Sequence, residues 1–217
     1  MFAISEYEER IRKTKEGMYE RGIEILIVSY PANINYLSGY DGWSFYVHQG
    51  LIISLDYQEP IWFGREQDSN AARLLTSLRV EDIMGYPDHY VMSKLHHPMD
   101  FVAQILRERG WGEKHIGIEM EGYYFTTEGY LALKRELPDA TFKDGTLVVN
   151  LVRRIKSPAE IEYINQAAKI AEKVMRTAIE FIEPGRREND AAGEVYRAQI
   201  CGQPRSEERR VGKECRS

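Results

Sequence analysis

Along the first 150 positions, short apolar runs alternate with stretches in which apolar residues recur at helical spacing. Residues 23–29 read Ile-Glu-Ile-Leu-Ile-Val-Ser, a β-branched and nearly all apolar run that is typical of a strand buried on both faces. Shorter runs predict further strands at residues 51–55, 61–63, 80–84, 116–119 and 140–142. Because a doubly buried strand needs helices on both faces of its sheet, the pattern predicts a three-layer α/β domain.

Between these runs, apolar residues recur every three or four positions, which predicts helices. The first helix begins at a capping box formed by Ser5 and Glu8 and ends at Gly22. Others are predicted over residues 68–78, 99–109, 126–137 and 147–155. The helix over residues 68–78 is expected to face the core with Ala71, Ala72, Leu74, Leu75 and Leu78.

The pattern changes at Pro158. A long helix with apolar residues three or four positions apart is predicted from there to Pro184, and another over residues 189–200. These helices have too little chain around them to bury their apolar faces. We therefore expect one domain over residues 1–155 and an incomplete second domain over residues 156–204.

The last thirteen residues, 205–217, read Arg-Ser-Glu-Glu-Arg-Arg-Val-Gly-Lys-Glu-Cys-Arg-Ser. Their high charge density and lack of apolar periodicity are typical of a segment that does not fold. The string resembles the in-frame translation of a sequencing adapter, so we expect it not to be native and the natural frame to continue beyond Pro204. A genuine solvated tail is the alternative.

Composition and motifs exclude several classes of function. No apolar run approaches the roughly 20 residues that span a bilayer, and the first residues show no basic region followed by an apolar one, so we expect a cytoplasmic protein without a membrane partner. The net charge of -5, without a basic stripe, argues against nucleic-acid binding. The two cysteines, Cys201 and Cys215, form no disulfide framework. No nucleophile elbow, phosphate loop or dinucleotide fingerprint is present.

Residues 37–49 carry the candidate binding groups: Asp41, Trp43, Phe45, Tyr46 and His48. Aromatic faces attract delocalised cations, an aspartate pairs with positive charge, and a histidine can donate to a carboxylate or move a proton near neutral pH. Together these groups suit a small zwitterion.

The same stretch also allows a structural interpretation. Pro31 ends the preceding strand, and residues 33–36 are interpreted as a connection to the aromatic stretch. If residues 43–48 are extended, Trp43 and Phe45 lie on the opposite face from His48, so a bend at a neighbouring glycine is needed to line one pocket. An aromatic-rich strand and hairpin that packs on the core is the alternative.

Other polar residues are weaker candidates. His89 and the pair His96 and His97 lack the spacing of a zinc site, and we expect them to be loop histidines without a metal. Glu119 and Glu121 lie two positions apart and could divide acid and base roles if burial separated their pKa values. A solvated strand end is the simpler interpretation of these two residues.

Several segments resemble the creatinase and prolidase superfamily. They are Arg-Arg-Ile-Lys-Ser-Pro-Ala-Glu-Ile at residues 153–161 with the helix after it, Ile-Glu-Pro-Gly at 182–185, and Asn-Ile-Asn-Tyr-Leu-Ser at 33–38. The resemblance covers residues 1–204 and implies a three-layer creatinase-like amino-terminal domain followed by the truncated start of an α+β pita-bread domain. A closer resemblance, to the superfamily members that hydrolyse ectoine, rests on residues 39–49, 60–68 and 85–91.

The resemblance implies a homodimer in which the amino-terminal domain of one subunit reaches over the catalytic domain of the other. In creatinase-like relatives this domain lends the partner's site an aromatic residue and an arginine. Phe45 stands at the aromatic position, but Val47 stands at the position of the arginine. Recognition of a substrate carboxylate is therefore left to His48 or to groups outside this chain.

The implied reaction is hydrolytic opening of the cyclic amidine of ectoine to N-acetyl-2,4-diaminobutyrate. The resemblance places all catalytic residues beyond Pro204, so we expect no catalytic residue, metal ligand or cofactor in this chain and no activity from the chain alone. The peptidase branch would use two divalent metal ions bound beyond residue 204. An Xaa-Pro dipeptidase, another creatinase-like amidinohydrolase and a non-enzymatic binding or scaffold domain are the alternatives.

Overall fold

A computed structural model describes residues 2–202 of the 217-residue chain. The chain divides into two compact units, with the boundary between Ile155 and Lys156. None of the helices within the described residues is both long and apolar enough to cross a membrane. The residues interpreted as an adapter translation, 205–217, lie outside the described part of the chain.

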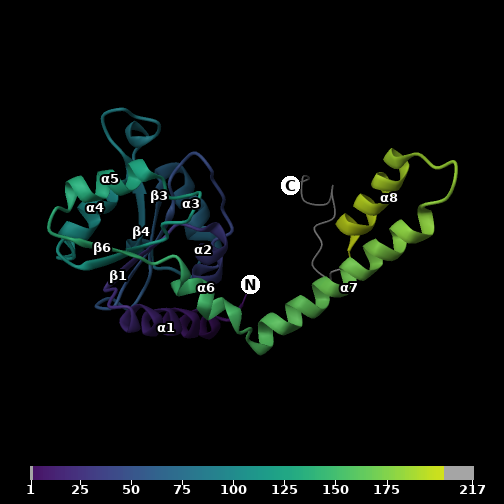
Figure 1. The fold of residues 1–217 in the computed structure, drawn as a ribbon, viewed down its shortest axis with the longest axis horizontal. Helices are drawn as coiled ribbons and strands as arrows, with labels where there is room; N and C mark the ends of the chain where they lie inside the picture. The colour runs from purple at the N-terminus through teal and green to yellow at the C-terminus, as the bar shows by residue number, and fades with distance from the viewer. Residues whose placement is uncertain (1, 203–217) are drawn as a thin grey trace, which may run out of the picture. The chain divides into compact units, whose positions relative to one another are not determined.

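The first unit is built around a six-stranded sheet with the order β4-β3-β2-β1-β5-β6. Figure 1 shows this sheet with helices packed around it. The strands are β1 Ile25–Val28, β2 Gly50–Ser54, β3 Ile61–Arg65, β4 Ile83–Tyr86, β5 His115–Ile118 and β6 Thr141–Asp144. β2 runs antiparallel to both of its neighbours, and the other neighbouring pairs are parallel. β1 is therefore an interior strand of the sheet, and its apolar sequence had predicted a strand buried on both faces.

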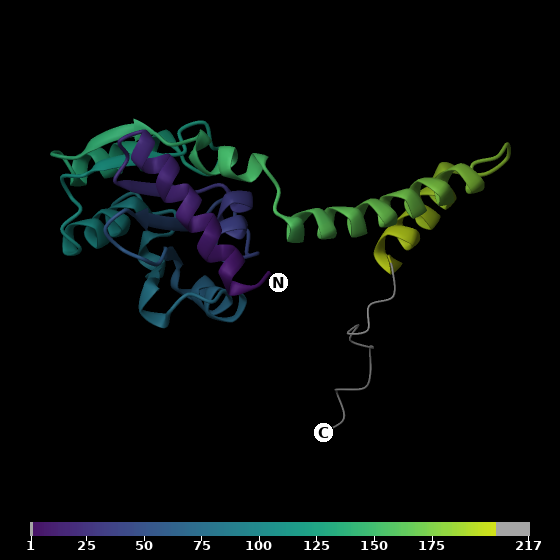
Figure 2. The same cartoon turned by 90° about the horizontal axis from the view of Figure 1, so that it is seen from below.

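Helices cover both faces of the sheet. They are α1 Ile4–Glu20, α2 Pro31–Ser38, α3 Glu66–Leu75, α4 Pro98–Glu108, α5 Thr127–Glu136 and α6 Leu147–Arg154. One hydrophobic cluster joins the sheet to α4 and α5, and a second joins it to α1, α2, α3 and α6. Figure 2 shows α1 running across the face that it covers. This arrangement confirms the predicted three-layer α/β fold.

Successive side chains of β1 point to opposite faces of the sheet and so belong to different hydrophobic clusters. Ile25 and Ile27 belong to the cluster under α4 and α5, while Leu26 and Val28 belong to the cluster on the opposite face. All four side chains are fully buried. Burial of an aliphatic side chain of this size contributes about 1.5–3 kcal/mol, so this short strand is a large part of the driving force for folding.

Two helix predictions are wrong in detail. The predicted capping box at Ser5 does not form, because α1 already begins at Ile4 after Ala3, whose side chain makes no capping bond. Leu74 does not face the core and is 82% exposed. The reason is helical geometry: Ser69 and Ala72 are the buried residues of α3, and Leu74 lies about 200° further round the helix than Ala72.

The strand predicted over residues 80–84 is replaced in part by a 3-10 turn, Val80–Asp82, before β4. The carboxylate of Asp82 is buried and accepts hydrogen bonds from Arg79 (2.9 Å) and from the Tyr57 hydroxyl (2.7 Å). These bonds draw the chain into a turn that leaves Val80 68% exposed.

Residues 33–36 are not a connection but the middle of α2. Pro31 opens this helix because a proline at the first position fixes a helical φ and has no N–H to leave unpaired. Gly39 ends it with φ 78°, a conformation that favours glycine. Residues 40–49 then form an irregular loop, so neither an extended strand nor a hairpin is present there.

The second unit contains two helices, α7 Pro158–Phe181 and α8 Glu188–Cys201, which lie side by side (Figures 1 and 2). Both were predicted from apolar spacing. Ser157 and Glu160 form a capping box at the start of α7. No residue of α7 is buried, and Ala198 is the buried residue of α8.

Candidate functional site

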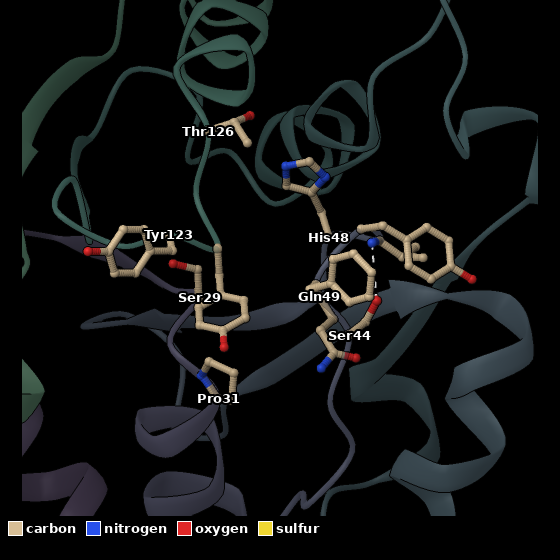
Figure 3. A pocket seen from close by; sticks show the side chains of 11 residues that line it. Ser29, Pro31, Ser44, His48, Gln49, Tyr123 and Thr126 are labelled. Carbon is tan, nitrogen blue, oxygen red and sulfur yellow. Dashed lines mark hydrogen bonds between the residues drawn. The ribbon is translucent and has the colours of Figure 1, made fainter.

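A hollow of about 230 Å³ lies beyond the carboxyl ends of the parallel strands β1 and β5 (Figure 3). The carboxyl ends of parallel strands are the usual place for ligands in α/β sheets. Three segments line the hollow: the turn from β1 into α2, the loop before β2, and the loop between β5 and α5. Its eleven lining residues are Ser29, Pro31, Ser44, Phe45, Tyr46, Val47, His48, Gln49, Tyr123, Tyr124 and Thr126.

His48 is the titratable group of this hollow with the most altered environment. Its Nε2 atom is shut off from solvent and has no hydrogen-bond partner. Burial, together with the nearby His97, lowers the pKa of His48 to about 4. The ring is therefore neutral near pH 7, with one ring nitrogen as a donor and the other as an acceptor, and the tautomer decides which is which.

The surroundings of His48 keep its ring in place. The hydroxyl of Tyr86 donates to the backbone carbonyl of His48 (2.5 Å), and the imidazole lies edge-on against that of His97. His97 in turn caps α4. Its Nδ1 accepts from the backbone N–H of Met99 (3.0 Å), and its backbone N–H donates to the carboxylate of Asp100 (2.8 Å). Thus the start of α4 supports the wall of the hollow that carries His48.

The three aromatic candidates before His48 are largely exposed. Trp43, Phe45 and Tyr46 are 62%, 74% and 53% exposed, and their rings follow one another with centroids 5.6 Å apart. Phe45 and Tyr46 line the hollow, whereas Trp43 does not. The indole N–H of Trp43 donates to the hydroxyl of Tyr124 (3.0 Å), so Trp43 joins the two loops that form the hollow.

Asp41, the predicted partner for positive charge, is exposed and is not among the lining residues. The loop that carries Asp41 is held at its base by the buried side chain of Gln49. The side chain of Gln49 accepts from the Tyr40 hydroxyl (3.2 Å) and donates to the carbonyl of Gly42 (3.0 Å). The structure therefore gathers Phe45, Tyr46 and His48 at the hollow but leaves Asp41 outside it.

The lining of the hollow carries no Asp, Glu, Lys or Arg. It offers aromatic faces, hydroxyl groups, one amide and one neutral imidazole. Such a surface attracts a delocalised cation through the ring quadrupoles and pairs a carboxylate only through neutral donors. A second hollow of about 230 Å³ shares Tyr46, Val47, His48 and Thr126 and adds His97 and Glu128.

Glu119 is not the solvated strand end that its sequence position indicated. It directly follows β5 and is fully buried, whereas Glu121 is exposed as expected. Its carboxylate accepts hydrogen bonds from the N–H groups of Ser29 (2.6 Å) and Tyr30 (2.7 Å) and from the side-chain amide of Asn33 (2.5 Å). Burial raises the pKa of Glu119, and these bonds oppose the increase.

Among residues 2–202, no group of three or more His, Cys, Asp or Glu side chains is placed to hold a metal ion. The histidines that were considered as ligands have other surroundings. His89 is exposed and its ring lies 5.5 Å from that of His96, while His97 is the cap of α4.

The sequence analysis did not identify one wall of the hollow, which is formed by Tyr123, Tyr124 and Thr126. The available signal was a pair of adjacent tyrosines after Gly122, just beyond the end of a predicted strand. Ser29 and Pro31 were also missed as lining residues. They follow the carboxyl end of β1, so the same rule about parallel strands applies to them.

Comparisons with known proteins agree with this fold. Residues 10–155 match the family model described as the Creatinase/Prolidase N-terminal domain. The ectoine hydrolase of Halomonas elongata is 46% identical over 202 residues, which cover 93% of this chain and 50% of that protein. The Xaa-Pro dipeptidase of Pyrococcus furiosus is 27% identical over 188 residues, covering 87% of this chain and 47% of that protein.

A solved structure is similar in fold. The Xaa-Pro dipeptidase from Bacillus anthracis superposes with a TM-score of 0.70 at 21% identity, covering 89% of this chain and 49% of that one. The chain thus spans about half the length of the curated relatives that it matches. Because the family model matches most of the first unit and a relative at 46% identity covers nearly the whole chain, the chain belongs to the creatinase/prolidase family through its amino-terminal domain.

Proposed function

We propose that the chain is part of a hydrolase that opens the cyclic amidine of ectoine to N-acetyl-2,4-diaminobutyrate, and that the hollow beside His48 contacts this substrate. The observation that carries the proposal is the uncharged, aromatic lining of the hollow around a neutral imidazole. The 46% identity to an ectoine hydrolase supports the choice of substrate.

The lining suits the two charged ends of such a zwitterion. The positive charge of an amidinium is spread over a plane, and it gains from contact with the faces of Phe45, Tyr46 and Tyr124. The carboxylate needs donors, which the ring of His48 and the hydroxyls of Ser44 and Thr126 can supply. Because no arginine lines the hollow, these neutral donors carry the recognition of the carboxylate within this chain.

In the reaction, the oxygen of water bonds to the amidine carbon, and one ring C–N bond breaks. The amidine carbon becomes the acetyl carbonyl, and the released nitrogen takes up both protons of the water and becomes an ammonium group. Residues of this chain bind and orient the substrate in this proposal. The groups that activate water lie outside residues 2–202, and no cofactor is assigned to the described residues. A cytoplasmic homodimer, in which this hollow faces the catalytic half of a partner, is also part of the proposal.

An Xaa-Pro dipeptidase is the second candidate, because the relative at 27% identity and the solved structure with the same fold both carry that name. This candidate would use two divalent metal ions bound beyond residue 204. The two candidates differ in the test substrate and in their response to a chelator. A non-enzymatic binding or scaffold domain would hydrolyse neither substrate.

The test uses the natural full-length enzyme that contains these residues. Its hydrolysis of ectoine is followed by NMR through the new acetyl methyl signal, and an Ala-Pro dipeptide is assayed in parallel. His48→Ala is expected to lower kcat/KM for ectoine about 10-fold, the effect of one lost hydrogen bond to a charged group. His89→Ala is the matched control, because this exposed histidine lies outside the hollow.

Three outcomes would contradict the proposal. Cleavage of the dipeptide without hydrolysis of ectoine would favour the dipeptidase. Turnover of neither substrate would favour a binding or scaffold domain. Equal activity of the His48→Ala and His89→Ala enzymes would remove the hollow from substrate binding even if ectoine is the substrate.

A further inference from the structure

We propose that Glu119 is a positioning residue, whose buried carboxylate holds the turn from β1 into α2 and, through Tyr30 and Tyr124, sets the place of Trp43 at the rim of the hollow. This inference deepens the proposed function and rests on it only where the ligand is concerned.

The first step is the contact between Glu119 and the turn. One carboxylate oxygen accepts from the backbone N–H of Ser29 (2.6 Å), from the backbone N–H of Tyr30 (2.7 Å) and from the Ser29 hydroxyl (3.3 Å). Ser29 lines the hollow, and Tyr30 is the N-cap of α2. The carboxylate thus holds a segment that lies 90 positions earlier in the chain.

Helix α2 has no side-chain cap of its own, and the carboxylate of Glu119 bonds the two residues just before its first residue, Pro31. The first N–H groups of a helix lack partners within the helix, and they carry a partial positive charge. Glu119 bonds the N–H groups of Ser29 and Tyr30, which directly precede the first helical residue, Pro31, and so places a complementary negative charge near the start of the helix. Glu119 thus fixes the N-cap residue, Tyr30, from the end of the neighbouring strand β5.

The second step runs from Tyr30 to the rim of the hollow. The Tyr30 ring packs edge-on against Tyr124 with centroids 6.1 Å apart, and its hydroxyl donates to the carbonyl of Glu121 (3.2 Å). A Cβ at Gly122 would come within 3.0 Å of the Tyr30 ring, so a glycine permits this close packing. Tyr124 then accepts the indole N–H of Trp43.

The other carboxylate oxygen of Glu119 joins the turn to α6. It accepts from the amide of Asn33 (2.5 Å), and that amide also donates to the side chain of Asn150 (2.8 Å). Arg153 donates to the oxygen of Asn33 (2.7 Å). The carboxylate of Glu119 is therefore linked to the guanidinium of Arg153 through the side-chain amide of Asn33. These bonds also hold α2 against α6.

Glutamine cannot replace glutamate in this network. Donors approach both carboxylate oxygens, namely the N–H groups of Ser29 and Tyr30 on one side and the Asn33 amide on the other. An amide has only one oxygen, so in either orientation its NH₂ group faces a donor. Glu119→Gln should therefore loosen the turn while changing the volume of the core very little.

The experiment records the indole N–H signals of the 217-residue chain by ¹H–¹⁵N NMR. The chain has three tryptophans, of which Trp62 and Trp111 are buried and belong to the two hydrophobic clusters. Trp43→Phe assigns the signal of Trp43. Tyr124→Phe shows where that signal lies when the indole has lost its acceptor while Glu119 is intact.

We expect Glu119→Gln to move or broaden the Trp43 signal toward its position in Tyr124→Phe, with the signals of the two buried tryptophans unchanged. The matched control is Glu121→Gln, which alters an exposed side chain two positions along and should leave the Trp43 signal in place. If Glu119→Gln does not fold, Asn33→Ala removes the bond on the second oxygen and should shift the same signal less far.

The inference would be overturned if Glu119→Gln lowered the melting temperature but left the Trp43 signal unmoved, because Glu119 would then act on stability alone. If Glu119→Gln does not fold, the same result for Asn33→Ala would overturn it. Adding ectoine to the unaltered chain tests the proposed function separately. A ligand that leaves the Trp43 signal unchanged in the unaltered chain counts against ectoine binding, whereas the effect of Glu119→Gln is measured without a ligand.

Discussion

The imidazole ring of His48 lies edge-on against the ring of His97, with centroids 4.7 Å apart and an angle of 66° between the ring planes. His48 belongs to the loop that lines the hollow, and His97 is the N-cap of α4. The contact therefore couples the binding loop to the end of a helix that packs on the core. Burial lowers the pKa of both histidines, which makes this pair sensitive to acid.

The stability of the first unit should fall as the pH decreases from about 6.5 toward about 4. In that range His48 takes up a proton in the unfolded chain, where its pKa is near 6.5, but not in the folded chain, where it is about 4. The unfolded state binds more protons, so acid favours it, with a slope of at most about 1.4 kcal/mol per pH unit for this residue. His97, with its pKa also lowered, acts in the same direction.

Urea unfolding at several pH values between 7 and 4 measures this effect. His48→Phe removes one titrating ring and should flatten the dependence relative to the unaltered chain. Since carboxylates titrate in both proteins, the difference between the two curves isolates His48. Parallel curves for His48→Phe and the unaltered chain would show that His48 does not contribute.

His97→Ala should destabilise the chain by about 1 kcal/mol, because the first turn of α4 loses the acceptor for the N–H of Met99. His97→Asn should restore most of this loss, since an asparagine oxygen is a good N-cap acceptor. Chemical denaturation compares the two variants with the unaltered chain. Equal losses for alanine and asparagine would indicate that ring packing against His48, not capping, is what His97 contributes.

Gly39→Ala should be more destabilising than Gly110→Ala. Both glycines have positive φ, 78° and 73°, so alanine is strained at either position by about 1 kcal/mol. At Gly39 the new Cβ would also lie 2.9 Å from the hydroxyl oxygen of the buried Tyr7, while at Gly110 no atom lies within 4 Å. Thermal unfolding of the two variants gives the difference.

Combining Gly39→Ala with Tyr7→Phe removes that hydroxyl and should recover part of the additional loss. Recovery would show that the packing of α1 against the end of α2 helps to fix the start of the binding loop. If the double variant is no more stable than the two single changes predict by addition, the contact with Tyr7 is not the cause.

Leu74→Gln should change the free energy of unfolding by no more than about 0.5 kcal/mol, because the side chain is 82% exposed. Ala72→Leu, two positions earlier in α3, should cost about 1–3 kcal/mol, because Ala72 is fully buried and the larger side chain overpacks the core. Urea unfolding of both variants tests which face of α3 packs on the sheet.

The hydrophobic pattern was sufficient to predict the layers of the first unit. Strand β1 could be identified as buried on both faces because its apolar residues leave no face for water, and most helices could be placed because their apolar residues recur at helical spacing. The pattern failed at α2, whose short sequence begins with proline and carries two asparagines. It also failed for Leu74, because composition alone does not say which of several apolar residues faces the core.

Sequence by itself determined the order of the strands and of the helices other than α2, the burial of strand β1 on two faces, and the presence of aromatic residues and a histidine in one short stretch, because these follow from local spacing. Tertiary structure alone decided that Tyr124 meets Trp43 across 81 positions and that Glu119 meets Ser29 across 90. Periodicity tells which face of an element is buried but not which distant element covers it. That choice follows from the order of the strands in the sheet, and it places Tyr124 and His48 around one hollow, with Glu119 buried behind Ser29 in its wall.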